Sequence, residues 1–272
     1  MSAIADGEIR TIGGLAVTLH GPADAPPVLL SAGLGGQGTY WWPQLEALSR
    51  RHRVILYDHR GTGLSDRHLP DTYCSVDLGL DLQIILDGLS LPSAHLVGHA
   101  AGAVAAFELA LLAPERVRTV TAVNGWALAD AHFKRCFEIR LGIYKAGGAE
   151  AYLRAQPLFL FPADWISDHL DELDAQAAHH AETFQDETTL TRRISALVDF
   201  NIEARLPEIV CPILAIAAED DMLVPSRCSR QLCAGLPNAR IVMMRRGGHA
   251  INLTQPVDFN AALLGFLEEQ DH

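Results

Sequence analysis

The chain has 272 residues and a formal net charge of −12 at pH 7, and it carries no cluster of basic side chains. This balance argues against nucleic acid and anionic membranes as partners, and no apolar run reaches the roughly 20 residues of a membrane span. The first eight residues contain no basic segment followed by an apolar one, so we expect no secretory signal and a cytoplasmic protein. We expect buried, reduced thiols at the five scattered cysteines, Cys74, Cys136, Cys211, Cys228 and Cys233.

Strand-like and helix-like segments alternate along most of the chain. A hairpin is expected around Gly13-Gly14, and further strands at residues 27–31 and 53–57, from residue 94 up to the turn at Gly98, and at residues 117–123, 211–217 and 240–244. Helices are expected at residues 40–51, 75–89, from about 101 to Pro114, 227–236 and 256–268. This alternation predicts an α/β fold with a mostly parallel central sheet and helices on both faces.

The pattern changes between residues 127 and 206, where no convincing strand occurs. Apolar side chains recur there at helical spacing, as at Phe133, Phe137 and Leu141. We therefore divide the chain into an α/β core, residues 1–126 and 207–272, and an inserted helical cap of about four helices, residues 127–206. The cap would cover the carboxyl edge of the sheet, where ligands bind in open α/β sheets.

The run Ala94–Ala106 reads as a strand, a tight turn and a helix. Its glycines, Gly98 and Gly102, frame the turn as in the nucleophile elbow G-x-S-x-G, where Cβ atoms would collide. Ala100 occupies the position that the nucleophilic serine has in this motif. The alternative is that the two glycines only allow a helix to pack on a strand.

A carboxylate and a histidine follow later strands in the order elbow, acid, histidine, which is the order of α/β-hydrolases. Asp221 precedes Pro225 by four residues, and His249 follows Gly247-Gly248. A buried Asp221 would orient the imidazole of His249, and His249 would act as the base. Alone, His249 also fits a hydrogen-bonded surface histidine and Asp221 a helix N-cap; Asp220 is the alternative acid.

The segment Ala32–Gly36 matches the loop that supplies an oxyanion donor in this kind of fold, although a plain glycine-rich turn is the alternative. Backbone N–H groups do this work, and we assign it to Leu34, which follows Gly33, and to Ala101. The motif Asp58-x-Arg60-Gly61-x-Gly63-x-Ser65 is assigned a bracing role. A phosphate-binding loop is the rival interpretation there, but no Lys-Ser/Thr follows.

Large aromatic side chains near these motifs are candidates to line a small pocket. Trp126 and Trp165 are the main ones, together with Tyr40, Trp41 or Trp42, although large aromatic residues also serve as plain core. We expect no metal and no cofactor. The twelve histidines are dispersed, and the adjacent pair His179-His180 would point its rings about 100° apart on a helix.

Most of the chain resembles the α/β-hydrolase superfamily with a helical cap. Within it, the chain is similar to the pyrimidine-utilisation D family of bacterial uracil catabolism. The stretches that carry the resemblance are Ser31–Gly36, Gly98-His99-Ala100, Val123–Trp126, Arg135-Cys136-Phe137 and Gln156–Trp165. The resemblance implies a small-molecule substrate, carbamate or, by an earlier proposal, aminoacrylate, and an alanine that is natural at the elbow.

Without a hydroxyl at Ala100 no acyl-serine can form, so a water in its place would have to be activated by His249 and Asp221. Together with the resemblance, this implies a hydrolase of a non-peptide C–N bond in a small, labile compound. Three alternatives stay open: a serine hydrolase of ester or C–C bonds inactivated by Ser→Ala, a non-catalytic metabolite-binding module, and a cofactor-free lyase with His249 as base. The oligomeric state also stays open, with a homodimer as one possibility.

Overall fold

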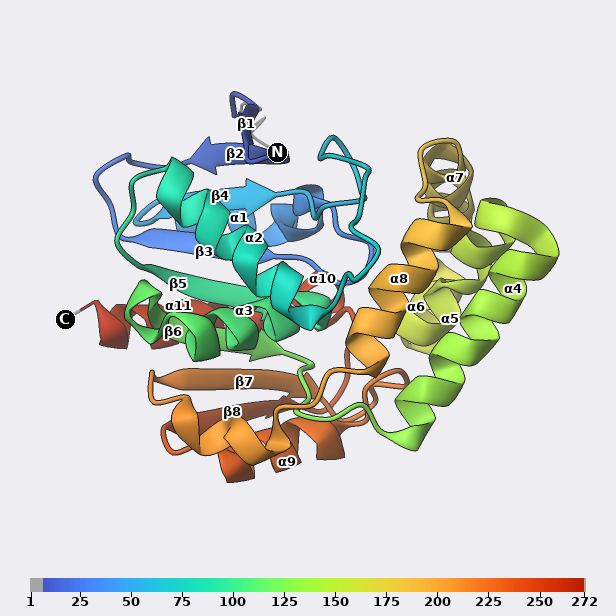
Figure 1. The fold of residues 1–272 in the computed structure, drawn as a ribbon. Helices are drawn as coiled ribbons and strands as arrows, with labels where there is room; N and C mark the ends of the chain where they lie inside the picture. Colours follow the sequence, from blue (N-terminus) through green and yellow to red (C-terminus); the bar gives the residue numbers. More distant parts are fainter. Residues whose placement is uncertain (1–6, 272) are drawn as a thin grey trace.

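The computed structural model describes residues 7–271, and its centre is an eight-stranded sheet. The strand order is β1-β2-β4-β3-β5-β6-β7-β8 (Figure 1). The pairs β1–β2 and β2–β4 are antiparallel and all others parallel, which confirms the predicted sheet. The strands are β1 (Arg10–Ile12), β2 (Leu15–His20), β3 (Pro27–Ser31), β4 (Arg53–Tyr57), β5 (Ala94–His99), β6 (Val117–Val123), β7 (Ile213–Ala218) and β8 (Ala239–Met244).

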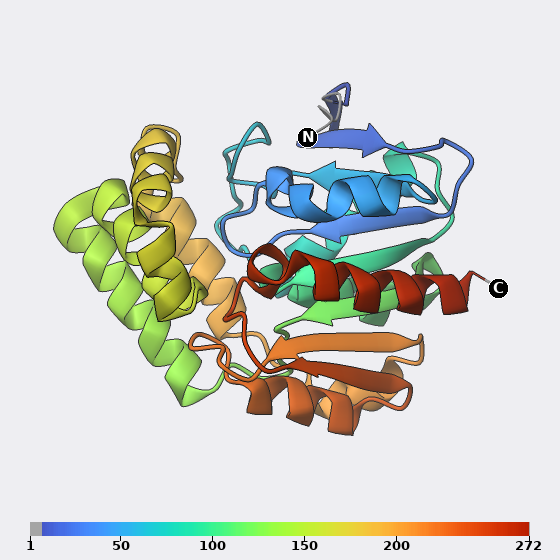
Figure 2. The same ribbon diagram turned by 180° about the vertical axis from the view of Figure 1, so that it is seen from behind.

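Helices cover both faces of the sheet, because its central strands are buried on both sides and rich in apolar residues. One face carries α1 (Trp42–Ser49) and α11 (Pro256–Gln270), with the short α10 (Ile251–Thr254) beside them (Figure 2). The other face carries α2 (Ser75–Gly88), α3 (Ala101–Leu112) and α9 (Ser226–Gly235). Three short 3₁₀ turns complete the core: η1 (Gly38–Trp41), η2 (Pro114–Arg116) and η3 (Glu203–Glu208).

Five helices between β6 and β7 form the cap. They are α4 (Ala131–Ala155), α5 (Pro157–Leu160), α6 (Ala163–Asp168), α7 (Leu170–Ala181) and α8 (Glu187–Val198). Helix α4 is interrupted at Gly148, which has a φ of 70°. The carboxylates of Asp130 and Asp186 cap α4 and α8 by accepting hydrogen bonds from backbone N–H groups in the first turn.

The two chain segments that connect the core to the cap lie side by side. Leu128 and Asn201 form an isolated antiparallel bridge, and the Ile202 N–H donates to the Ala127 carbonyl at 2.9 Å. The cap then lies along one edge of the sheet (Figure 1), where the Ala250 N–H donates to the Leu160 carbonyl. The boundaries at residues 127 and 206 stay a prediction. The contacts described here show that the two segments joining the core to the cap pair with each other.

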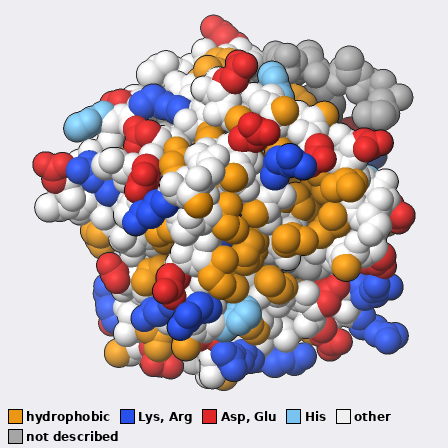
Figure 3. All heavy atoms as spheres, turned by 90° about the vertical axis from the view of Figure 1, so that its right-hand side faces the viewer, with side chains coloured by type: hydrophobic (Ala, Val, Ile, Leu, Met, Phe, Trp, Pro, Cys, Tyr) orange, Lys and Arg blue, Asp and Glu red, His pale blue; other side chains and the backbone are white. Residues whose placement is uncertain are grey.

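The outer surface of the cap mixes charged side chains with a central group of hydrophobic ones (Figure 3). Exposed large hydrophobic residues of the cap include Ile139, Leu158 and Leu170. No helix within residues 7–271 is long and apolar enough to cross a membrane. All five cysteines are free, but the expectation that all are buried holds only for Cys136 and Cys228. Cys211 and Cys233 are half-buried, and Cys74, at the N-cap of α2, is exposed.

Candidate active site

The turn between β5 and α3 has the backbone of a nucleophile elbow. Ala100 has a φ of 49° and a ψ of −103°, a strained conformation for a residue with a Cβ. A Cβ on Gly98 would lie 2.2 Å from the Gly102 carbonyl carbon, and one on Gly102 would lie 2.0 Å from the Ser31 carbonyl oxygen. The glycines therefore allow close packing of α3 on β3 and β5, and that packing holds Ala100 in its strained state.

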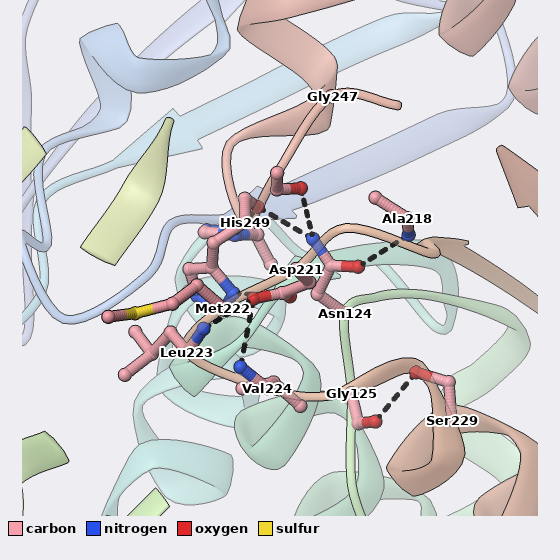
Figure 4. Close-up of polar contacts among 12 residues, drawn as sticks. Asn124, Gly125, Ala218, Asp221, Met222, Leu223, Val224, Ser229, Gly247 and His249 are labelled. Atoms are coloured by element: carbon pink, nitrogen blue, oxygen red, sulfur yellow. Dashed lines mark hydrogen bonds and ion pairs between the residues drawn. The ribbon is translucent and has the colours of Figure 1, made fainter. Parts of the chain in front are cut away.

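Asp221 and His249 form a hydrogen-bonded pair beside this turn (Figure 4). The Nδ1 of His249 lies 2.8 Å from Oδ2 of Asp221, and both side chains are buried. The other carboxylate oxygen, Oδ1, accepts the N–H groups of Leu223 at 2.8 Å and Val224 at 2.9 Å. With Nδ1–H directed to the carboxylate, the lone pair of the imidazole is at Nε2, which makes no hydrogen bond to any residue in the described part of the chain.

The loop that carries His249 is clamped from three sides. The carbonyl oxygen of His249 accepts hydrogen bonds from the side-chain amide of Asn124 at 2.6 Å and from Nε2–H of His99 at 2.9 Å. Asp220, the alternative acid, instead accepts the N–H groups of Gly247 and Gly248. Asp220 therefore braces the loop, and Asp221 is the acid that reaches the imidazole.

Asn124 and His99 are residues that the sequence analysis did not select. Asn124 follows β6 with a φ of 49°, and its side-chain oxygen also accepts the Ala218 N–H (Figure 4). The ring of His99 lies 4.6 Å from that of His249, between centroids, and stacks on Tyr40. Burial, reinforced by the neighbouring His249, lowers the pKa of His99 well below its ordinary value. His99 is therefore a neutral donor to the His249 loop.

The predicted oxyanion loop lies against the elbow. A Cβ on Gly33 would come within 2.8 Å of Nδ1 of His99, so Gly33 must be a glycine for the loop to approach β5 so closely. The N–H groups of Leu34 and Ala101 donate to no carbonyl or side chain among residues 7–271. Ala101 is the first residue of α3, where N–H groups point out of the helix and favour negative charge.

The Asp58 motif braces this loop, as expected. The Asp58 carboxylate accepts the N–H groups of Gly38 and Leu64, both at 2.9 Å. Ser65 donates to the Asp58 carbonyl at 2.6 Å and accepts from the Ala16 N–H. These bonds join β2, β4 and the loop after β3.

The aromatic candidates separate into three groups. Trp126 is buried against Phe133 in the hydrophobic cluster that also holds Ala100 and Ala101, and its indole N–H has no acceptor among the described residues. Trp165 is half-buried in the cap between the rings of Phe161 and His169. Of the three residues 40–42, only Tyr40 contacts the site through His99. Trp41 is core on the far face of the sheet, and Trp42 is exposed.

Two arginines from the cap are buried next to this site, and the sequence analysis missed both. Arg193 of α8 donates to the Leu34 carbonyl at 2.7 Å, to Gln185 at 2.9 Å and to Nδ1 of His59 at 3.0 Å. Arg140 of α4 lies over the rings of Phe137, Tyr152 and Phe159. The one available signal was their position on the apolar stripes of their helices, three residues after Phe137 and Leu190.

The described residues offer no ready metal centre. Among residues 7–271, no group of three or more His, Cys, Asp or Glu side chains could hold a metal ion. The adjacent rings of His179 and His180 are 5.5 Å apart and inclined by 49°. The polar groups at the elbow are instead suited to binding a small molecule with backbone N–H donors and an imidazole.

Comparison with known families agrees with this architecture. Residues 26–146 match the family described as the alpha/beta hydrolase fold. A solved hydrolase from Pseudomonas aeruginosa superposes with a TM-score of 0.86 at 26% identity, over 97% of this chain and 99% of that one. An enol-lactonase from Burkholderia xenovorans LB400 superposes with a TM-score of 0.86 at 24% identity, over 96% and 100% of the two chains, which supports the fold alone. The fold and the elbow are thus those of an α/β-hydrolase.

Sequence relatives narrow this class. The chain is 49% identical over 259 residues to the "Putative carbamate hydrolase RutD" of Caulobacter sp. (strain K31), covering 94% of this chain and 97% of the relative. It is 44% identical over 243 residues to the protein of the same name from Serratia proteamaculans (strain 568), covering 89% and 91%. The chain therefore belongs to the α/β-hydrolase family, in the group formed by these RutD relatives.

Proposed function

We propose that the protein hydrolyses a non-peptide C–N bond in a small, labile compound, carbamate or aminoacrylate, with a water activated by His249 and Asp221. The observation that carries the proposal is the intact Asp221–His249 pair beside an elbow that holds Ala100 in place of a nucleophile. The name of the relatives, "Putative carbamate hydrolase RutD", supports the substrate class.

The reaction with carbamate follows from the positions of three groups. Nε2 of His249 takes a proton from water as the water oxygen attacks the carbonyl carbon. The N–H groups of Leu34 and Ala101 stabilise the negative oxygen that forms. The C–N bond then breaks, the proton on Nε2 passes to the leaving nitrogen, and ammonia and hydrogencarbonate are released. Asp221 stabilises the imidazolium between these two steps.

The expected acceleration suits a labile substrate. General-base assistance contributes about 10²–10⁴-fold, and loss of one oxyanion donor costs about 10²–10³-fold. A stable amide or ester would need a larger acceleration than these two devices supply without a covalent intermediate. A compound that already decomposes in water needs only this much help.

The test is the timed decay of freshly generated carbamate, and separately of aminoacrylate, with and without the protein. We expect the wild-type chain to accelerate one of the two above its spontaneous rate and His249→Gln to remove that acceleration. His68→Gln, an exposed histidine in the loop after β4, is the matched control and is expected to keep the wild-type rate. Equal turnover by wild type and His249→Gln would show that the imidazole is not the base.

A further inference from the structure

The cap places two positive charges in the protein interior without a counter-ion. Arg140 is 4% exposed and Arg193 is 2% exposed. Among the described residues, no carboxylate oxygen lies within 4.0 Å of either guanidinium. A guanidinium keeps its charge in proteins, and burying an unpaired charge is costly. Two such charges in one small insertion therefore call for a negative partner.

The carboxylates within electrostatic reach are already occupied. Asp81 interacts with the Arg193 charge, but it is ion-paired with Arg60 at 2.8 Å. Asp221 accepts hydrogen bonds from His249 and from two backbone N–H groups. The direct acceptors of Arg193 are the neutral groups of Leu34, Gln185 and His59. The hydroxyl of Tyr73, also neutral, lies close to the same guanidinium. The chain thus positions the guanidinium without neutralising it.

Arg140 lies over the ring of Tyr152, and the charge of Arg193 also acts on this side chain. The guanidinium carbon of Arg140 lies 4.9 Å from the centre of the Tyr152 ring. Burial raises the pKa of the Tyr152 hydroxyl, and the charges of Arg140 and Arg193 both oppose that rise. The Nε–H groups of both arginines and the Tyr152 hydroxyl are buried without a partner in the described chain. Two cations and three unused donor groups therefore share one region of the cap.

This region adjoins the catalytic pair and the oxyanion loop. Arg193 holds the carbonyl of Leu34, the residue whose N–H we assign to the oxyanion hole. Arg140 lies over Phe159, whose neighbour Leu160 accepts the Ala250 N–H, next to His249. Near the start of α4, His132 hydrogen-bonds the Met222 carbonyl beside Asp221, which brings this helix close to the acid. The donors thus face the same edge of the sheet as the elbow.

We infer that Arg140, Arg193 and Tyr152 form a binding site for the carboxylate of a small anionic substrate, held between the cap and the elbow. Guanidinium groups bind carboxylates by paired N–H donors, and water exclusion strengthens such bonds. The inference rests on the proposed function, because carbamate and aminoacrylate are both carboxylate anions at neutral pH. It adds that the charge of the substrate, recognised by the cap, is what the protein selects.

The test measures the binding of stable anions to the whole chain by NMR titration. Acetate has the shape of carbamate and acrylate the carbon frame of aminoacrylate; acetamide and acrylamide are their neutral counterparts. We expect saturable binding of at least one acid, and binding of its amide that is at least about tenfold weaker. An amide that binds as tightly as its acid would overturn the inference.

Two substitutions locate the site. Arg140→Met and Arg193→Gln are each expected to weaken anion binding by about tenfold or more. Arg135→Gln and Arg192→Gln are matched controls on the same helices, since these arginines pair with Glu138 and Asp71, and they are expected to keep wild-type affinity. Unchanged anion affinity in both Arg140→Met and Arg193→Gln would place the ligand elsewhere.

Stability separates a ligand site from a structural role. Arg140 makes one hydrogen bond, at 3.3 Å to Gln156, and its other contacts are with the faces of three aromatic rings. A methionine of similar length removes the buried charge and can still pack on these rings. We expect Arg140→Met to raise the urea midpoint of the ligand-free protein while lowering its anion affinity. A lower midpoint with unchanged affinity would make Arg140 structural. His249→Gln should still bind the anion, so its turnover tests the mechanism separately from this site.

Discussion

Replacement of Asp221 by asparagine gives the sharpest test of the catalytic pair, because the structure fixes how the new amide must lie. Oδ1 of Asp221 accepts the N–H groups of Leu223 and Val224. Only the amide oxygen of Asp221→Asn can stay there, so its NH₂ group takes the place 2.8 Å from Nδ1 of His249. An amide N–H donates, so the ring must accept at Nδ1 and carry its proton on Nε2. The lone pair that would activate water is then lost.

The size of the effect follows from the alternative orientation. Turning the amide so that its oxygen faces His249 would leave the Leu223 and Val224 N–H groups against an NH₂ group. Each buried donor left unsatisfied costs about 1–3 kcal/mol, so the active tautomer lies about 2–6 kcal/mol higher. At about 1.4 kcal/mol per factor of ten, that lowers the catalysed rate by about 30-fold to 10⁴-fold.

The assay is the decay of freshly generated substrate above its spontaneous rate, with urea unfolding to show that the variant is folded. Asp220→Asn is the control, because Asp220 accepts two backbone N–H groups and touches no imidazole. It is expected to lose less than about tenfold in rate and about 1 kcal/mol in stability. A folded Asp221→Asn protein with wild-type turnover would refute the assignment of His249 as an oriented base.

Three further outcomes are expected. Gly102→Ala should unfold the protein or lower its stability by more than about 3 kcal/mol in urea titrations, because its Cβ would lie 2.0 Å from the Ser31 carbonyl oxygen; near-wild-type stability would show that α3 is not held so tightly. Ala100→Ser should place a hydroxyl at the elbow that a serine-directed phosphonate labels, and no labelling would place residue 100 away from a reactive position. Acid should destabilise the fold. Burial lowers the pKa of the imidazoles of His59, His95 and His99 below their unfolded value of about 6.5. The unfolded chain therefore binds more protons than the folded chain as the pH falls. The loss approaches about 1.4 kcal/mol per pH unit for each histidine between its unfolded pKa and its lowered folded pKa, and urea midpoints that are equal at about pH 7.5 and 5.5 would contradict it.

The sheet and the hydrogen-bonded pair of Asp221 and His249 were predictable because each depends on local patterns that repeat along the chain. Apolar runs ending in glycine or a carboxylate fix the strands and place Asp221 and His249 at one edge. The glycines of the elbow are needed for a close approach that only glycine allows, so their spacing predicts the turn.

The residues that hold the site together were not predictable in the same way. Asn124 and His99 act through the carbonyl of His249, which lies 125 and 150 residues further along the chain, respectively. Arg140 and Arg193 lie on helical stripes that otherwise consist of core side chains. Periodicity shows that such positions face inward, but only the packing of the cap on the core shows what they face.

The strained backbone at Ala100 has a consequence for how this fold changes its chemistry. The φ of 49° is imposed by the packing of neighbouring segments, with no side-chain hydrogen bond from residue 100 itself. The backbone conformation that presents a nucleophile is therefore a property of the fold, and it is the same whether residue 100 is an alanine or a serine. A substitution at residue 100 can therefore add or remove a nucleophilic hydroxyl while the backbone around it stays as it is.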